Sequence, residues 1–366
     1  MPALAASVSW ERRFCVRSRR THAPIIFWAS LIALQFTGHT LDGLSTIGET
    51  ANMAHYDIHH VDCFEWLREQ QAPLSIQGVC TDPPFGIVEF LPHEMAKLRS
   101  GRGGVWRIPP SIGGSQRAPL PRFTTLSPQE REHVRIYFRE FGEALMPALV
   151  PGAHVFLAGT PMLQHLVQSG MAEAGYEVRG AVMRLYRGFR GGDRPKLAEQ
   201  EFAEVCVTPR GTYEPWMLFR KPIAEKTVAQ NLRKWGTGAL RRLSIDQPLP
   251  DIIQSGKTPV LEEAISSHPT LKPQHLLRIL TRSLLPLGQG QILDPFCGSG
   301  STLAACQAIG YEAVGIEVDD TYFASLRVNI EQFAKLYPTY TGETLEMPSD
   351  CIPLTKSRER RQGMLL

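Results

Sequence analysis

The chain has 366 residues, enough for two or three domains or for one large α/β domain with insertions. Apolar residues make up 43% and charged residues 20% of it, which excludes a wholly disordered or fibrous chain. The net charge of +3 is too small to indicate a polyanionic partner by itself. The seven cysteines are widely spaced and form no C-x-x-C pair, which argues against a disulfide framework or a zinc site and favours a reducing, cytoplasmic location.

Residues 1–52 differ from the rest of the chain. Five arginines precede the apolar run 25–36, whose 12 residues are too few for a bilayer span, which takes roughly 20. A basic segment before a short apolar run is also typical of an export signal. We favour a disordered or spurious extension, a working start at Met53 and no membrane partner, because the chain after Met53 has the pattern of an intracellular protein.

After Met53, strand-like and helical patterns alternate. We expect strands at 56–60, 76–81, 154–158, 176–186, 214–220, 291–293 and 313–317. We expect helices at 64–68, 130–149, 161–174, 269–285, 301–309 and 322–336. This alternation predicts an α/β fold with a mostly parallel, doubly wound sheet covered on both faces, in which 176–186 and 214–220 are antiparallel neighbours.

A glycine-containing loop follows the strand expected at 291–293. It reads Asp294-Pro295-Phe296-Cys297-Gly298-Ser299-Gly300 and opens a helix, so it lies at the carboxyl edge of the sheet, where such folds bind ligands. Glu317 ends the next strand, at the spacing of an acid that accepts hydrogen bonds from ribose hydroxyls. The loop lacks the lysine of a phosphate-binding loop and the third glycine of a dinucleotide loop. Asp294 suits instead a ligand with ammonium and sulfonium groups, which predicts S-adenosylmethionine (SAM) as the cofactor.

A second loop, Asp82-Pro83-Pro84-Phe85, ends the strand expected at 76–81. Its two prolines stiffen the turn and lack backbone N–H groups, so the Asp82 carboxylate and backbone carbonyls face outward as acceptors. Two acceptors that hold the N–H bonds of an exocyclic amine free the nitrogen lone pair for attack on a methyl group. Phe85 offers a flat face for an extruded base. The loop therefore predicts catalysis by positioning and electrostatics.

These motifs resemble those of the β-class of DNA amino-methyltransferases, the N6-adenine and N4-cytosine enzymes. The second loop resembles their catalytic motif and the first their cofactor loop, while the run 268–273 resembles their H-P-T-x-K-P element and 214–222 a further strand. The catalytic motif precedes the cofactor loop, which is the circularly permuted order of the β-class. The resemblance covers about residues 56–337 and implies a Rossmann-like SAM-dependent methyltransferase fold.

The resemblance also implies roles for individual residues. It assigns the target base to the catalytic residues Asp82, Pro83, Pro84 and Phe85, with Phe85 where tyrosine is commoner. It assigns the cofactor to Asp62, Thr270, Lys272, Asp294, Phe296, Gly298, Ser299, Gly300 and Glu317. Asp62 would lie near the adenine, Glu317 at the ribose, and Thr270 and Lys272 at the methionine end, while His268 shapes the turn.

The same motifs divide the chain into five expected segments. An extension (1–52) precedes a catalytic half (53–222) that contains a mobile basic loop (87–127). A small target-recognition insert (223–267) separates it from a cofactor-binding half (268–337), and a tail (338–366) follows.

Two segments concentrate positive charge. Residues 95–122 contain six basic residues and no acid, and residues 220–242 contain seven basic residues and one acid. We predict contacts with the phosphates of double-stranded DNA from these segments, although a solvated basic loop is the alternative for each. The predicted DNA-binding residues are Arg99, Arg102, Arg107, Arg117, Arg233, Lys234, Arg241 and Arg242.

The target base and the remaining partners depend on the resemblance. Asp82 at the head of the catalytic motif favours adenine N6, with cytosine N4 as the close alternative. A non-catalytic DNA-binding relative is disfavoured by the intact Asp82 and glycines, and an RNA or protein-glutamine methyltransferase by the motif order. The family implies a cognate restriction endonuclease as a further partner and a monomer or homodimer.

Overall fold

The computed structural model describes residues 55–69, 75–86, 111–112, 115–116, 126–186, 195, 198, 200–207, 209, 211–266, 268 and 270–346. By its internal contacts the chain divides into Met1–Glu49 and Thr50–Leu366, and every described residue belongs to the second unit. The extension expected at 1–52, nearly all of the loop at 87–127 and the tail after residue 346 lie outside the described residues.

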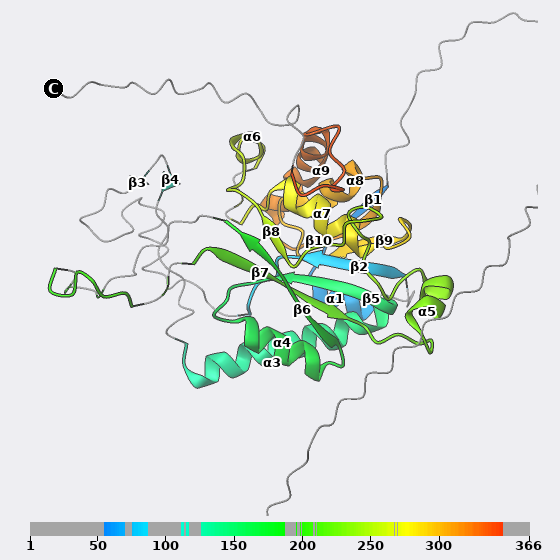
Figure 1. The fold of residues 1–366 in the computed structure, drawn as a ribbon, viewed down its shortest axis with the longest axis horizontal. Helices are drawn as coiled ribbons and strands as arrows, with labels where there is room; N and C mark the ends of the chain where they lie inside the picture. The colour runs from blue at the N-terminus through cyan, green and yellow to red at the C-terminus, as the bar shows by residue number, and fades with distance from the viewer. Residues whose placement is uncertain are drawn as a thin grey trace, which may run out of the picture. The chain divides into compact units, whose positions relative to one another are not determined.

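An eight-stranded sheet forms the centre of the fold, in the order β1-β10-β9-β2-β5-β7-β6-β8 (Figure 1). Neighbouring strands are parallel except that β7 runs opposite to both β5 and β6. The predicted mostly parallel α/β sheet and the antiparallel β6–β7 pair are confirmed. The strands of the sheet are β1 (Tyr56–His60), β2 (Ile76–Thr81), β5 (Leu149–Ala158), β6 (Glu177–Leu185), β7 (Tyr213–Arg220), β8 (Ile252–Gln254), β9 (Gln291–Asp294) and β10 (Glu312–Glu317); β3 (Ser111–Ile112) and β4 (Ser115–Gln116) form a separate antiparallel pair.

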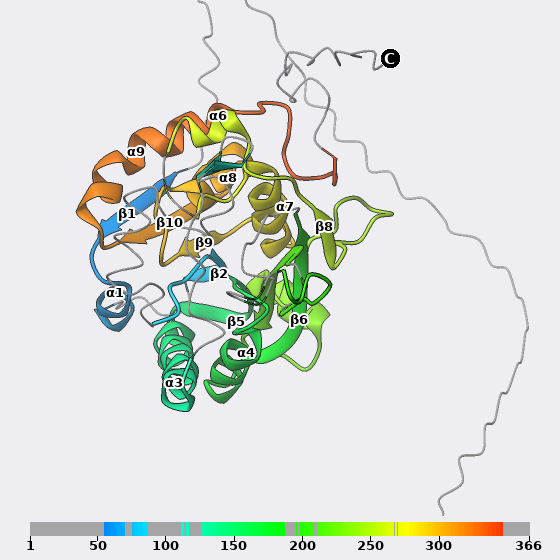
Figure 2. The ribbon, with the colours of Figure 1, turned by 90° about the vertical axis from the view of Figure 1, so that its left-hand side faces the viewer.

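Helices cover both faces of this sheet, so the fold has three layers. Helices α7, α8 and α9 pack together on one face, and α1, α3 and α4 cover the other (Figures 1 and 2). The helices are α1 (Cys63–Glu69), α3 (Pro128–Leu145), the 3-10 helix η2 (Met146–Ala148), α4 (Gln164–Glu173), α5 (Val228–Trp235), α6 (Val260–Glu263), α7 (Gln274–Leu284), α8 (Ser301–Ala308) and α9 (Asp320–Lys335).

The order of the strands reverses between β2 and β9. After β2 the chain crosses through α3 to β5 on one side, and after β9 it crosses through α8 to β10 on the other side. These two helices lie on opposite faces of the sheet. Doubly wound sheets bind their ligands at such a switch in strand order, outside the carboxyl ends of the strands, which here are those of β2 and β9.

Local signals explain most of the element boundaries. Ser127 accepts a hydrogen bond from Glu130 N, while the Glu130 side chain accepts from Ser127 N, which is the capping box that starts α3. All ten residues of β5 are buried, as expected for a central strand covered on both faces. Asp319 caps α9 by accepting from the backbone N–H groups of Thr321 and Tyr322.

The structure corrects two parts of the predicted pattern. The helix expected at 130–149 ends at Leu145, because Pro147 cannot continue it, and the next strand already begins at Leu149. Residues 221–267, expected to have little regular structure, contain α5, β8 and α6. Among the described residues, no helix has both the length and the apolar character needed to cross a bilayer.

Candidate active site

The two predicted loops meet at the switch in strand order. β2 and β9 are adjacent and parallel, with Gly78 opposite Ile292 and Val79 opposite Leu293. The last residue of each strand joins them, because Thr81 donates from Oγ1 to Asp294 Oδ1 over 2.6 Å. Both loops therefore begin at the same edge of the sheet.

The glycine loop needs its glycines for both conformation and space. Gly298 and Gly300 have φ angles of +50° and +83°, in the left-handed region that disfavours other residues. A Cβ on Gly300 would lie 2.6 Å from Ile330 and 2.8 Å from Leu326 of α9. A Cβ on Gly298 would lie 2.9 Å from His268 Nε2. The loop backbone is therefore packed closely between α9 and the segment that carries His268.

Glu317 supports this loop from the end of β10. It is 9% exposed, and its two carboxylate oxygens accept from Gly298 N (2.7 Å) and from Asp319 N (2.8 Å). Each oxygen has a second lone pair, so the carboxylate can also accept from the hydroxyls of a ligand.

Asp294 is buried at the base of the loop, 3% exposed. Besides Thr81 it accepts from Phe296 N over 3.2 Å. Burial raises the pKa of Asp294 to about 6, although hydrogen bonds from Thr302, Thr81 and the Phe296 backbone favour its charged form. A carboxylate stabilised this poorly by its own surroundings is suited to a positively charged ligand.

The remaining predicted cofactor residues also lie at or near this edge. Asp62 follows β1, whose last residue, His60, pairs in register with Glu317. Asp62 Oδ1 caps α1 by accepting from Phe64 N over 2.9 Å. Phe296 packs against Phe141, with ring centroids 5.6 Å apart. Ser299 is buried, with its Oγ 3.1 Å from Ser301 Oγ.

His268 approaches the glycine loop from the segment before α7, and the exposed Thr270 contacts His268. The His268 ring packs against Tyr322 at 4.4 Å between centroids, and its Nδ1 accepts from Thr270 N over 3.3 Å. Burial lowers the pKa of His268, while Asp82 and Glu317 act in the opposite direction. The ring is therefore a neutral wall beside Gly298 at neutral pH, with Nε2 directed toward the glycine loop.

The catalytic loop leaves Asp82 partly exposed and Phe85 buried. Phe85 is 8% exposed and lies 6.3 Å from Phe138 between ring centroids, so much of the face expected to stack on a base is covered. A Cβ on Gly86 would lie 2.7 Å from Tyr137 of α3. Helix α3 thus supports the loop from below the sheet (Figure 2).

A chain of alternating charges extends from Asp82, and the sequence did not predict it. Lys272 Nζ lies 2.9 Å from Asp82 Oδ2 and 2.8 Å from Glu214 Oε1. Glu214 Oε2 also binds Arg184 Nη1 at 3.1 Å and accepts from Trp216 Nε1 at 3.2 Å. Lys272 is thus in contact with the catalytic loop, while its predicted place at the methionine end of the cofactor stays a prediction.

The charges of this chain stabilise one another. Burial alone would raise the pKa of Glu214, but Lys272 and Arg184 lower it to about 2. Burial opposes the ammonium charge of Lys272, yet Asp82 and Glu214 hold its pKa above the usual value. No short sequence motif contains these partners, since they come from β6, β7 and two loops far apart in the chain.

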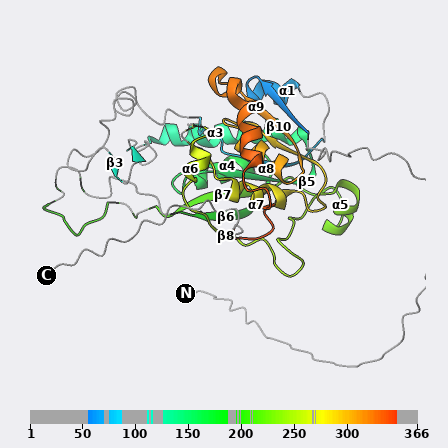
Figure 3. The ribbon, with the colours of Figure 1, turned by 90° about the horizontal axis from the view of Figure 1, so that it is seen from above.

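The four predicted DNA-binding residues that the structure describes do not lie at this edge. Arg99, Arg102, Arg107 and Arg117 lie outside the described residues. β7 ends at Arg220, opposite His154, which is the first residue of β5 that pairs with β7, so the segment after β7 begins toward the amino edge of the sheet. Helix α5 stays at this edge, because Asn231 Nδ2 donates to Pro151 O over 2.9 Å. Figures 1 and 3 show α5 on the opposite side of the sheet region from α6.

Three of the four described basic residues also have local partners, among them Arg242, whose Nε donates to Ile245 O over 3.0 Å. Lys234 Nζ lies 2.7 Å from Glu225 Oε1, and Arg241 donates to the Tyr311 hydroxyl. Arg233 and Arg242 are exposed. Their assignment to DNA stays a prediction, and the structure separates all four from the catalytic loop.

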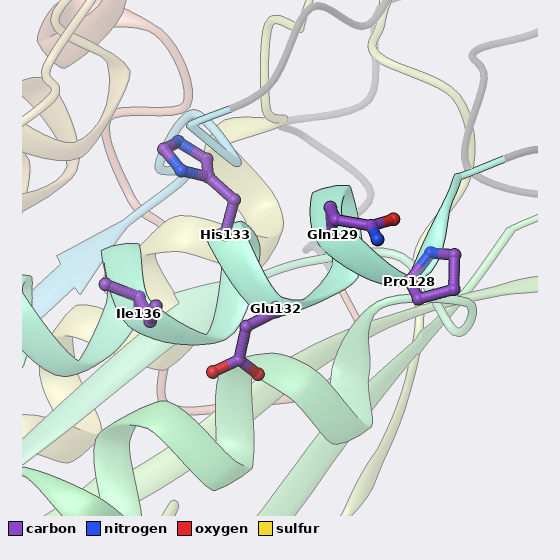
Figure 4. Close-up of a pocket in the computed structure, with 5 residues that line it drawn as sticks. All are labelled: Pro128, Gln129, Glu132, His133 and Ile136. Atoms are coloured by element: carbon purple, nitrogen blue, oxygen red, sulfur yellow. The ribbon is translucent and has the colours of Figure 1, made fainter.

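A shallow hollow on the outer side of α3 contains none of the predicted site residues. Pro128, Gln129, Glu132, His133 and Ile136 line it, and all five belong to one helix (Figure 4). Among the described residues, no group of three or more His, Cys, Asp and Glu side chains could hold a metal ion.

Comparison with known proteins identifies the family. A family model described as DNA methylase matches residues 76–327, more than half of the chain, and the chain belongs to this family of DNA N6 and N4 methyltransferases. The resemblance predicted from the motifs is confirmed.

The chain is also similar to individual proteins, in sequence and in fold. The chain is 29% identical over 276 residues to the Type II methyltransferase M2.DpnII of Streptococcus pneumoniae, covering 74% of this chain and 88% of that protein. It is 30% identical over 131 residues to the Type II methyltransferase M.HindIII of Haemophilus influenzae, covering 34% and 42%. The crystal structure of the M1.HpyAVI–SAM complex aligns with 75% of this chain and 100% of that chain, at 16% identity and a TM-score of 0.43.

Proposed function

We propose that this DNA methylase is a site-specific enzyme that transfers a methyl group from SAM to N6 of adenine in double-stranded DNA. The meeting of the Asp82 loop and the glycine loop at the switch in strand order carries the proposal, with the Thr81–Asp294 hydrogen bond between them. This arrangement supports an acceptor for an amine and a site for a cationic cofactor at one edge of the sheet.

The residues of the glycine loop fit SAM. Asp294 has the buried, poorly stabilised carboxylate that favours a positively charged neighbour, and Glu317 has lone pairs left for ribose hydroxyls. Gly298 and Gly300 allow close approach of the backbone. Thr270, Phe296, Ser299 and Asp62 complete the proposed binding set. When bound, the cofactor supplies an electrophilic methyl group on a sulfonium.

The chain's own residues would hold and orient the target amine. The exocyclic nitrogen of a base is a poor nucleophile because its lone pair is delocalised into the ring. Asp82 Oδ1 and a backbone carbonyl of the Pro83–Pro84 turn would accept its two N–H bonds and favour a tetrahedral nitrogen. Extrusion of the base from the duplex would bring the amine to this loop. The contribution of the protein is therefore orientation and electrostatic stabilisation.

Cytosine N4 is the second candidate target, because the geometry of Asp82 suits either amine. The Asp-led motif favours adenine. An RNA or protein-glutamine substrate, or a non-catalytic DNA-binding role, is a more remote alternative. The two relatives named as Type II methyltransferases support a partnership with a restriction endonuclease, which we include in the proposal.

Transfer from SAM carrying a labelled methyl group tests the activity. Unmethylated genomic DNA, RNA and protein are supplied in parallel, and the labelled DNA is digested and its nucleosides are separated. Label in N6-methyladenine supports the proposal, and label in N4-methylcytosine replaces the target base by the second candidate. Label in RNA or protein alone would reject a DNA substrate.

The salt dependence of DNA binding tests the predicted basic surface. Plots of the logarithm of the DNA-binding constant against the logarithm of salt concentration have a negative slope. If Arg233, Lys234, Arg241 and Arg242 contact phosphates, replacing them with glutamine makes this slope shallower by about 0.9 per contact. An unchanged slope would show that these four residues at the amino edge of the sheet do not contact DNA.

A further inference from the structure

The charge chain behind Asp82 has a partly exposed end at the carboxyl edge of the sheet and an end that is fixed in the fold. Asp82 is 24% exposed, whereas the Lys272, Glu214 and Arg184 side chains are 12%, 15% and 7% exposed. At the inner end, Arg184 Nη2 donates to Gly256 O over 3.1 Å, and Trp216, which donates to Glu214, is fully buried. The outermost charge is therefore tied through two others to the rigid β6–β7 ladder.

Stability does not explain such a chain. Buried or half-buried ion pairs gain little free energy over apolar side chains of similar volume, because the charges lose their hydration. The chain does fix geometry, since Glu214 Oε1 and Asp82 Oδ2 hold the same ammonium from two sides. A lysine held at one point only is a flexible cation. Held at two points, it becomes a fixed partner for one oxygen of Asp82.

The other oxygen of Asp82 is left for a ligand. Among the described residues, no hydrogen bond is made to Asp82 Oδ1, whereas Oδ2 is held by Lys272. The two oxygens of the carboxylate thus differ: Lys272 holds Oδ2, and Oδ1 is available to a ligand. An acceptor for an amine proton needs this defined direction, because a misplacement of about 1 Å can lower a rate by roughly 100-fold.

We propose that Glu214 is a positioning residue that, through Lys272, fixes the Asp82 carboxylate with Oδ1 toward the amine of the target base. The inference deepens the proposed function and rests on it. It also gives Lys272 a role in orienting the catalytic loop, where the sequence resemblance implied a contact with the methionine end of SAM. Arg184 completes the chain by holding Glu214 from the side opposite Lys272.

The same two strands contain a matched control. At the amino end of the β6–β7 ladder, Glu177 of β6 faces Arg220 of β7, and their Oε2 and Nη2 atoms are 2.6 Å apart. At the carboxyl end, Arg184 of β6 faces Glu214 of β7. Both pairs cross the same ladder. The Glu214 pair continues through Lys272 to Asp82, whereas the Glu177 pair lies at the other end of the ladder, where Arg220 is opposite His154 of β5.

The experiment compares Glu214→Gln with Glu177→Gln in the full chain. Methyl transfer to unmethylated DNA gives kcat and KM, calorimetry gives the Kd for SAM, and thermal unfolding gives the stability. We expect Glu214→Gln to lower kcat by roughly 100-fold while KM for SAM and its Kd stay unchanged, and Glu177→Gln to keep full activity. If Glu214 instead served cofactor binding through Lys272, its variant would raise the KM and Kd for SAM with little change in kcat.

A second variant separates positioning from folding. Glu214→Gln leaves Arg184 without its carboxylate, and an unpaired buried charge destabilises a protein. The double variant Arg184→Met/Glu214→Gln removes both charges, so it should recover stability and keep the low kcat. Full activity in this well-folded double variant would overturn the inference while the proposed function stood. Absence of transfer by the unaltered protein would reject the proposed function, and the inference with it.

Discussion

Replacement of Gly300 by alanine tests the packing of the glycine loop. Gly300 has a φ of +83° and precedes α8, and Gly310 has a φ of +77° just after the same helix. The two positions differ in their surroundings. A Cβ on Gly300 would lie 2.6 Å from Ile330, whereas a Cβ on Gly310 would meet nothing within 4 Å. Gly310→Ala is therefore the matched control for backbone strain alone.

The structure gives the magnitude of each effect. A left-handed conformation costs an alanine about 1–2 kcal/mol, and both variants incur this cost. At Gly300, the contacts with Ile330 and Leu326 are below 3.0 Å and involve branched side chains of α9, so that strain adds about 1–3 kcal/mol. Gly300→Ala should thus reduce the free energy of unfolding by the larger amount. It should also weaken SAM binding, because relief of the clash moves the loop that carries Gly298.

Denaturant unfolding and calorimetric titration with SAM measure the two effects. Gly310→Ala should keep the cofactor affinity of the unaltered protein. Equal destabilisation by the two variants would show that α9 yields freely at Gly300 and would refute the packing argument. Unchanged SAM affinity in Gly300→Ala would show that this loop does not contribute to cofactor binding.

Three other properties follow from the site. Asp82→Ala should lower the rate of methyl transfer by at least roughly 100-fold, because the carboxylate acts on the amine. SAM binding should remain measurable by calorimetry. Loss of SAM binding with retained turnover would contradict this role. Burial raises the pKa of Asp294 to about 6, so SAM affinity should be constant above this pH and fall below it as the carboxyl becomes protonated. Asp294→Asn should remove this pH dependence. Calorimetric titrations with SAM on both sides of the pKa measure the effect. Thr81→Val should lower the free energy of unfolding by about 1–3 kcal/mol because Asp294 loses its 2.6 Å hydrogen bond. Thr160→Val should be neutral or stabilising, since that buried hydroxyl has no partner among the described residues; equal losses in chemical denaturation would contradict the comparison.

The sequence predicts the layers of this fold well because the signals are local. The β5 strand is recognisable from its apolar residues, and the two loops are recognisable because each follows a strand and precedes a change in pattern. Helix α5 was missed, although Thr227 at its start and Gly236 at its end are typical caps. Eight residues between them contain too little apolar periodicity to outweigh the surrounding glycine and proline.

Contacts between distant segments could not be predicted in this way. The basic composition of 220–242 says nothing of the edge of the sheet at which it lies, and that edge follows from the antiparallel direction of β7. The partners of Lys272 depend on the same strand. Its motif position suggested a ligand contact, whereas the ladder brings Glu214 within 2.8 Å of its ammonium.

The antiparallel direction of β7 explains why an acid at the start of a strand reaches the active site. In a parallel strand the first residues lie at the amino edge, away from the two loops of the site. β7 runs the other way, so its first residues, including Glu214, lie at the carboxyl edge, and its last, Arg220, at the opposite one. A side chain near the start of β7 belongs to the regular ladder, and its position is more restricted than that of a loop residue. The fold thus supplies a carboxylate fixed in a strand next to the two loops of the site, and Lys272 connects it to Asp82.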